Sequence, residues 1–178
     1  NLNNELFLFS NIFNKILLIS SIIFFYLIPF YFLKIFKINK NQFSLNYFIL
    51  SLALTLISIY FFNYKYEYTG GGIFFKLSYM IFQNNFLFCF ISFLSVYFII
   101  NLINFKYSNI LLFLLLLLSN PQLTIYHKYY DPFMLILFFT ILNINLNIKI
   151  LKNNNSKIFI FLYFFIFLTI SNLKSYVL

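Results

Sequence analysis

Residues 86–103 read FLFCFISFLSVYFIINLI, an apolar run without a single charged residue. A helix needs about 20 mostly apolar residues to cross the hydrocarbon core of a bilayer. Five further runs of this kind are predicted as spans: Ile16–Leu33, Leu45–Phe62, Asn109–Tyr126, Pro132–Ile148 and Ile158–Ile170. We therefore expect an all-α fold, a polytopic bundle of about six transmembrane helices.

The composition agrees with lipid as the main solvent of this chain. Of its 178 residues, 63% are hydrophobic and 8% are charged, whereas a soluble domain has about 25% charged residues. No stretch is polar enough to form a second, soluble domain, so residues 1–178 are predicted as one transmembrane domain. Because the chain begins with Asn and ends within apolar sequence, we expect a fragment of a longer protein.

Local signals refine the predicted spans. Pro29 predicts a kink near the end of the first span. Ile73–Phe82 is apolar but too short to cross a bilayer, and it predicts an amphipathic helix in the membrane interface. The polar stretch 119–122 breaks the fourth span. Asp131 followed by Pro132 is typical of a helix start, and it predicts the beginning of the fifth span.

The charges predict an orientation. The net charge of +9 is the balance of twelve lysines and three acids, and the chain has no arginine. The lysines lie in short gaps between apolar runs, which favours membrane topology over a nucleic-acid partner. One side of the predicted bundle receives no acid and seven lysines: Lys34, Lys37, Lys40, Lys106, Lys149, Lys152 and Lys157. The other receives five lysines and all three acids: Lys15, Lys65, Lys76, Lys128, Lys174, Glu5, Glu67 and Asp131. The positive-inside rule makes the first side cytoplasmic and the acidic side external.

The first candidate site is the external loop that contains Glu67 and the glycines Gly70, Gly71 and Gly72. Glycine allows backbone N–H groups to approach a ligand closely, and a helix N-terminus attracts anions. The pattern is consistent with binding of a phosphate. Taken alone, the glycines are more typical of a loop where the chain changes direction, since no nucleotide-binding fingerprint accompanies them.

The second candidate site is the cluster 126–131, the densest group of polar and aromatic residues in the chain. Asp131 fits a helix cap, and it also fits a general base or metal ligand that faces an external cavity. His127 and Lys128 fit solvated interfacial residues, and they also fit cations that bind an anionic ligand. Ionisable groups at the membrane edge are candidates for function.

Several other classes of site are excluded by the motifs that are missing. The sequence has no Gly-x-Ser-x-Gly, no His-Glu-x-x-His and no pair of cysteines. One histidine cannot build a multi-histidine metal or haem site. Cys89 lies alone in an apolar run, and we interpret it as a buried structural thiol.

The order of these features resembles the N-terminal part of the GT-C glycosyltransferases, which include protein O-mannosyltransferases and lipid A aminoarabinose transferases. The resemblance covers residues 45–148: a span, an acidic external loop, an amphipathic segment, two spans with a tight cytoplasmic turn, and an Asp at the next helix start. The matching pieces are Leu45–Phe62, Glu67, residues 72–78, Phe86–Ile103, residues 109–118, Asn120-Pro121 and residues 129–135.

This resemblance implies transfer of a sugar from a polyprenyl-phosphate donor on the outer face of the membrane. It implies that Glu67 acts as base or metal ligand and that Asp131 takes the second acidic position. His127 and Lys128 are then candidates for binding the donor phosphate. A divalent metal ion is left open as a cofactor. The alternative is a non-enzymatic membrane protein, either a small transporter or a subunit of a larger complex.

Overall fold

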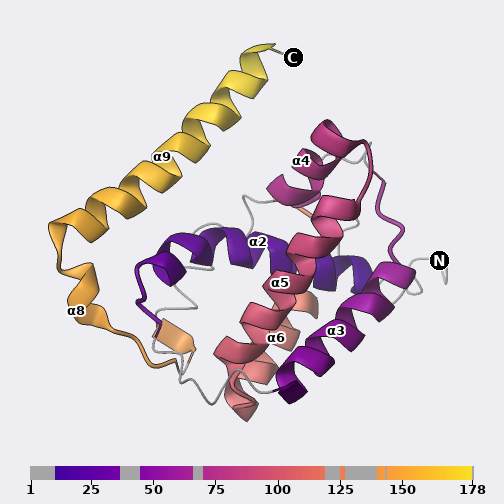
Figure 1. The fold of residues 1–178 in the computed structure, drawn as a ribbon, viewed down its shortest axis with the longest axis horizontal. Helices are drawn as coiled ribbons and strands as arrows, with labels where there is room; N and C mark the ends of the chain where they lie inside the picture. Colours follow the sequence, from indigo (N-terminus) through magenta and orange to yellow (C-terminus); the bar gives the residue numbers. More distant parts are fainter. Residues whose placement is uncertain are drawn as a thin grey trace. The chain divides into compact units, whose positions relative to one another are not determined.

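The computed structural model describes residues 11–36, 45–65, 70–118, 125–126, 140–142 and 144–177. Within this part, all seven regular elements are α-helices and no strand is formed (Figure 1). The helices are α2 (Ile12–Phe32), α3 (Leu45–Tyr60), α4 (Gly72–Phe82), α5 (Phe86–Ile103), α6 (Tyr107–Leu118), α8 (Ile148–Leu151) and α9 (Asn154–Val177). The predicted all-α class is confirmed for the described residues.

Among the helices that the structure describes, two, α2 and α5, are long and apolar enough to cross a membrane. This is fewer than the six predicted spans. α3 has 16 residues and is about 24 Å long at about 1.5 Å per residue, against a hydrocarbon core of about 30 Å. α6 and the apolar part of α9, Asn154–Ile170, are likewise apolar helices of only 10–17 residues. The predicted helix 73–82 is confirmed as α4, and Pro29 lies inside α2.

The fifth predicted span, Pro132–Ile148, is only partly covered. Residues 132–139 and 143 lie outside the described residues. The prediction that the helix continues to Ile148 is wrong, because residues 144–147 are not helical. Their apolar and polar residues alternate, and Leu146 forms an isolated antiparallel bridge with Phe36. The Asn147 N–H donates to the Ile35 carbonyl at 2.7 Å, so it is unavailable to a helix.

The chain forms two compact units. The smaller one comprises Leu27–Lys37 and Asn145–Leu178, and it contains the bridge to Phe36, α8 and α9. The larger one comprises Asn1–Tyr26 and Ile38–Ile144. It contains α3, α4, α5, α6 and most of α2, and therefore every glycine and both candidate sites.

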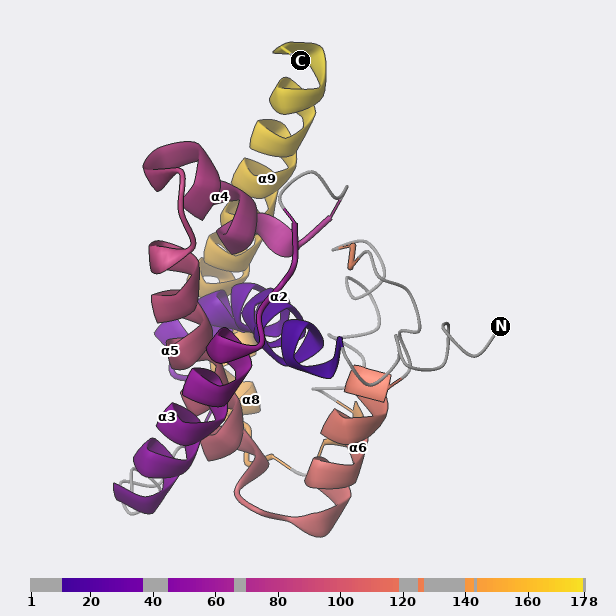
Figure 2. The same cartoon turned by 90° about the vertical axis from the view of Figure 1, so that its right-hand side faces the viewer.

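In the larger unit, α5 packs against both α3 and α4 (Figures 1 and 2). α2 contacts this group through aromatic rings: Phe24 meets Phe98 of α5, and Phe25 meets Phe74 of α4. At its other end, Phe13 stacks on Phe61, just after α3. The part of α2 that belongs to this unit thus contacts the unit's other helices at both of its ends.

The turn between α4 and α5 is fixed by hydrogen bonds. α4 ends at Gln83, whose left-handed conformation (φ 53°) is common at helix C-termini. The Ser78 hydroxyl donates to the Asn84 carbonyl at 2.7 Å and accepts the Phe88 N–H at 3.2 Å. This hydroxyl therefore joins the short α4 to the start of α5.

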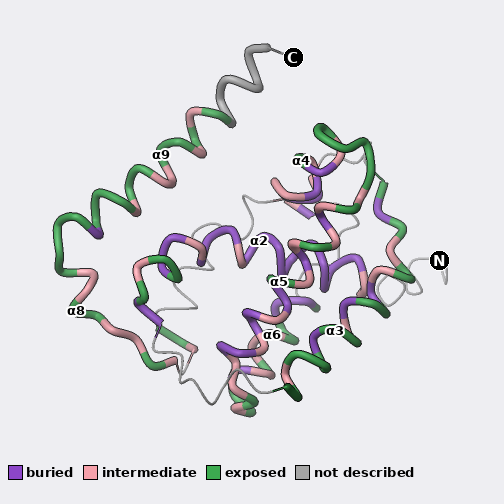
Figure 3. Tube along the Cα trace, viewed as in Figure 1, coloured by how far each residue is buried: buried purple, intermediate pink, exposed green. Residues whose placement is uncertain are grey.

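The burial pattern of α3 is the reverse of that of a helix in a water-soluble protein. Its buried residues are Ser51, Thr55 and Ser58, whereas most of its large apolar residues are exposed (Figure 3). The three hydroxyls donate to carbonyls of α3 itself, at 2.8 Å in each case. Small residues allow close approach of helix backbones, which is typical of helix pairs in membranes. α3 therefore presents its apolar side outward and its small polar side to the protein.

Candidate functional site

The three glycines form a tight turn that leads into α4. Gly70, Gly71 and Gly72 all have positive φ, at 139°, 87° and 78°. A Cβ atom on Gly70 would lie 2.7 Å from the Ile125 carbonyl oxygen, and one on Gly71 would lie 2.6 Å from the Phe75 ring. Both the backbone conformation and the close contacts therefore require glycine at these two positions.

This turn is hydrogen-bonded to the segment that precedes the second candidate site. The Gly71 N–H donates to the Ile125 carbonyl at 2.8 Å. The Ile125 N–H points to the Tyr64 hydroxyl oxygen at 3.4 Å. Residues 64 and 70–71 thus meet residue 125, which is far from them in the sequence.

An aromatic cluster packs next to the contact between the glycine turn and Ile125. Tyr64 is buried, and its ring lies edge-on to Phe75, with 5.3 Å between the ring centroids. Phe75 is fully buried and also contacts Phe62, Tyr79 and Phe88. The Tyr64 hydroxyl is therefore held in place at Ile125 by packing of its ring.

A second connection joins the start of α2 to the end of α3. The Asn14 side-chain amide donates to the Asn63 side-chain oxygen, and the Asn63 N–H donates to the Asn14 side-chain oxygen at 3.1 Å. Asn14 also donates to Asn11 at 3.1 Å. Because Asn63 immediately precedes Tyr64, this connection lies next to the meeting point of the glycine turn and Ile125.

The structure places only some of the predicted site residues. Gly70, Gly71 and Gly72 are described, and the Gly71 N–H already has an acceptor in Ile125. Glu67, His127, Lys128 and Asp131 lie outside the described residues, and their roles stay predictions. The described parts bring together the end of the Glu67 loop and Ile125, which lies just before the 126–131 cluster.

One residue that the sequence analysis treated as an ordinary flanking lysine is buried. Lys15 lies in the first turns of α2 and is 3% exposed. Its neighbour Asn14 is 4% exposed. The signal in the sequence was the pair Asn14-Lys15 directly before a long apolar run, which also fits a helix that starts earlier, as α2 does at Ile12.

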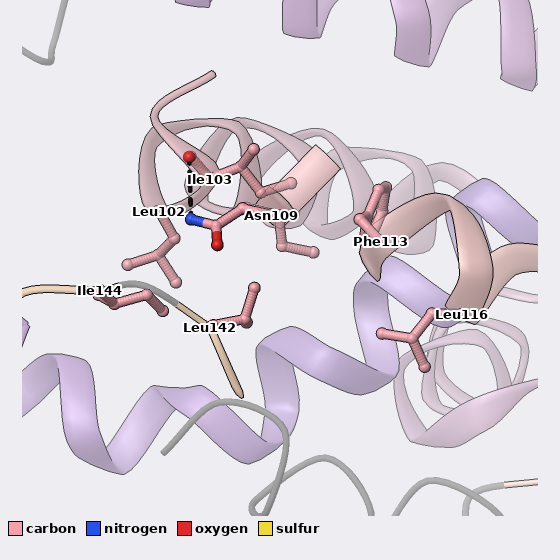
Figure 4. A pocket seen from close by; sticks show the side chains of 8 residues that line it. Leu102, Ile103, Asn109, Phe113, Leu116, Leu142 and Ile144 are labelled. Carbon is pink, nitrogen blue, oxygen red and sulfur yellow. Dashed lines mark hydrogen bonds between the residues drawn. The ribbon is translucent and has the colours of Figure 1, made fainter. Parts of the chain in front are cut away.

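The described residues form no cluster of metal ligands. Among them, no group of three His, Cys, Asp or Glu side chains lies close enough to hold a metal ion. A pocket between α5, α6 and the residues Leu142 and Ile144 is lined almost entirely by apolar side chains (Figure 4). Its polar lining residue, Asn109, donates to the Ile103 carbonyl at 3.2 Å. The pocket volume of 10 Å³ is at the lower limit for one water molecule, about 10–15 Å³.

Comparison with known proteins gives no relative for this chain: no family model, curated protein sequence or solved structure matches it.

Proposed function

We propose that the chain is an integral-membrane glycosyltransferase, or the N-terminal part of one, that uses a polyprenyl-phosphate sugar donor on the outer face of the membrane. The observation that carries the proposal is the contact of the glycine turn with Ile125. It connects the two segments in which the sequence analysis predicts the catalytic acids and the donor-phosphate ligands. The resemblance to GT-C glycosyltransferases supplies the reaction.

Chain connectivity supports a common site. Glu67 is three residues before Gly70, and His127 is two residues after Ile125. At about 3.3–3.6 Å per residue, three residues reach at most about 11 Å and two about 7 Å. Asp131 follows Ile125 by six residues, a reach of at most about 22 Å. Such distances allow Glu67, His127, Lys128 and Asp131 to face one donor and one acceptor.

Membrane insertion is supported by α2, α5 and the reversed burial of α3. In the proposal, α3, α6 and α9 are also membrane-embedded, which gives a multi-pass protein. α4 lies in the interface, and its exposed side chains include Met80, Ile81 and Phe82. The lysine-rich gaps face the cytoplasm, and the Glu67 loop and Asp131 face outward.

The proposed reaction needs one general base and one phosphate leaving group. The acceptor hydroxyl attacks the anomeric carbon of the sugar, and the bond between that carbon and the phosphate oxygen breaks. Glu67 or Asp131 takes the hydroxyl proton. The electron pair stays on the polyprenyl phosphate, whose negative charge is stabilised by His127 and Lys128. A divalent metal ion is compatible with this scheme as a ligand of either acid.

The test is sugar transfer in proteoliposomes. The purified chain receives a panel of radiolabelled polyprenyl-phosphate sugars, with membrane extract of the source cells as acceptor. We expect transfer by the wild type and a loss of at least about 100-fold in Glu67→Gln or Asp131→Asn, since general-base catalysis contributes about 10²–10⁴-fold. Lys152→Gln, at an exposed position outside the candidate site, is the matched control. Undiminished transfer after removal of both acids would exclude them as bases.

The exposed apolar side chains of α3 favour one second candidate, a subunit of a membrane complex. In that case Glu67→Gln and Asp131→Asn leave function unchanged, and no donor in the panel is consumed. Disruption then follows from changes on the exposed side of α3, such as Leu56→Lys, that prevent docking.

A further inference from the structure

Tyr64 contacts both segments that meet at the candidate site. Its hydroxyl oxygen accepts the Ile125 N–H at 3.4 Å. The same hydroxyl lies against the glycine turn, because a Cβ atom on Gly70 would be only 3.1 Å from it. A Cβ atom on Gly71 would be 3.0 Å from the Tyr64 ring. One side chain therefore touches both Ile125 and the turn that precedes α4.

The backbone of Ile125 is held at both of its polar groups. Its carbonyl accepts the Gly71 N–H at 2.8 Å, and its N–H donates to Tyr64. Ile125 is 1% exposed, so these two bonds are shielded from water. A buried backbone group without a partner is unfavourable, which favours keeping both bonds. Together they fix the direction in which the chain leaves Ile125 toward Tyr126 and the 126–131 cluster.

Tyr64 is itself anchored on two sides. Its ring is 5% exposed and lies edge-on to Phe75 of α4, which is fully buried. The residue before it, Asn63, exchanges hydrogen bonds with Asn14 of α2. Close packing leaves such a ring little room to move. The hydroxyl therefore defines a fixed position for the Ile125 N–H.

We propose that Tyr64 is a positioning residue for the binding of the donor phosphate. The inference rests on the proposed function, which assigns His127 and Lys128 to that phosphate. These two residues follow Ile125 by two and three positions, whereas Asp131 follows it by six. Each intervening residue adds two soft backbone dihedrals, so a fixed Ile125 restricts His127 and Lys128 more than Asp131. Loss of the Tyr64 hydroxyl therefore weakens donor binding more than it slows the chemical step.

The experiment compares the wild type with Tyr64→Phe, using the full 178-residue chain in phosphatidylcholine nanodiscs. This substitution removes only the hydroxyl and keeps the ring on Phe75. Tyr60→Phe, at a position that is 83% exposed, is the matched control. Three quantities are measured: the dissociation constant of a radiolabelled polyprenyl phosphate, kcat and KM for sugar transfer, and hydrogen exchange in the peptide that contains Ile125. The melting temperature checks that each variant is folded.

We expect Tyr64→Phe to bind the polyprenyl phosphate at least about fivefold more weakly and to raise the donor KM by a similar factor, because displaced ligands lose contact with the phosphate. kcat should change by less than about twofold, the pattern of a residue that contributes to binding. The Ile125 N–H should exchange roughly 2- to 10-fold faster, the effect of losing one typical hydrogen bond. A variant that was merely less well folded would lose active protein, so kcat would fall and KM would stay the same. Tyr60→Phe should match the wild type in every measurement.

The proposal is overturned if Tyr64→Phe binds the polyprenyl phosphate as tightly as the wild type does, or if exchange of the Ile125 N–H is unchanged. A wild type that binds no polyprenyl phosphate also overturns it, as does a fall in kcat with an unchanged KM. Failure of the proposed function is a separate result. A wild type that binds polyprenyl phosphate but transfers no sugar contradicts the glycosyltransferase, and the positioning role of Tyr64 is then decided by binding and hydrogen exchange alone.

Discussion

The helices α2 and α3 are both apolar in sequence, yet the structure uses them in opposite ways. Residues 14–23 of α2 are buried without interruption, whereas α3 buries only Ser51, Thr55 and Ser58 and exposes Leu56, Ile57 and other large side chains. This stretch of α2 is enclosed by protein, and α3 has protein on one side only. The comparison teaches that mean hydropathy identifies membrane helices but does not distinguish a helix inside a bundle from one at its edge.

The strongest test of this difference between α2 and α3 is to truncate the same type of side chain, a leucine, in each helix. Leu18 of α2 is fully buried, and Leu56 of α3 is 57% exposed. We expect Leu18→Ala to lower the free energy of unfolding by about 2–5 kcal/mol, through lost contacts and a cavity. Leu56→Ala should change it by less than about 0.5 kcal/mol. Unfolding in mixed micelles measures both, and equal losses would contradict the assignment of α3 to the edge.

A smaller effect is expected from adding bulk to the small polar side of α3. Ser58 is fully buried on a helix that packs against α5. Ser58→Leu should cost about 1–3 kcal/mol, because overpacking separates the helices. Ile57→Phe adds bulk at the adjacent, exposed position and should leave stability within about 0.5 kcal/mol of the wild type. Thermal unfolding of the two variants compares them directly, and the idea fails if Ser58→Leu is as stable as Ile57→Phe.

The smallest effect concerns the contact that joins the two helices. Asn14, near the start of α2, and Asn63, after the end of α3, exchange two hydrogen bonds. Asn14→Ala should cost about 0.5–1.5 kcal/mol, which is typical of a lost hydrogen bond. A double-mutant cycle with Asn63→Ala should give a coupling energy of at least about 0.5 kcal/mol. Additive effects of the two substitutions would mean that the contact does not connect α2 to α3.

Much of the helix content could be predicted from the sequence. The predicted limits of α5 agree with the structure, and α3 and α4 differ from their predictions by one or two residues at an end. Apolar runs and the polar residues between them determine these limits. The predicted span 132–148 failed at its C-terminal end, because the alternating residues 144–147 use their backbone groups outside a helix.

The candidate site was harder to predict for a physical reason. Gly71 and Ile125 are far apart in the chain, and no periodicity indicates that their backbones meet. The burial of Lys15 was missed because a lysine before an apolar run was assigned to a loop, whereas α2 begins three residues earlier. The roles of Glu67, His127, Lys128 and Asp131 stay predictions, since these residues lie outside the described part.

The short length of α3 has a consequence for the lipid around the protein. Its 16 residues span about 24 Å, several ångströms less than the hydrocarbon core of about 30 Å. Lipids next to a short hydrophobic segment compress, at a cost of a fraction of a kcal/mol per ångström of mismatch. Under the proposed topology, the bilayer is therefore locally thinner beside α3. If the proposed function holds, this thinning brings phospholipid headgroups closer to the glycine turn, and the proposed polyprenyl-phosphate donor reaches the site with a shorter movement along the membrane normal.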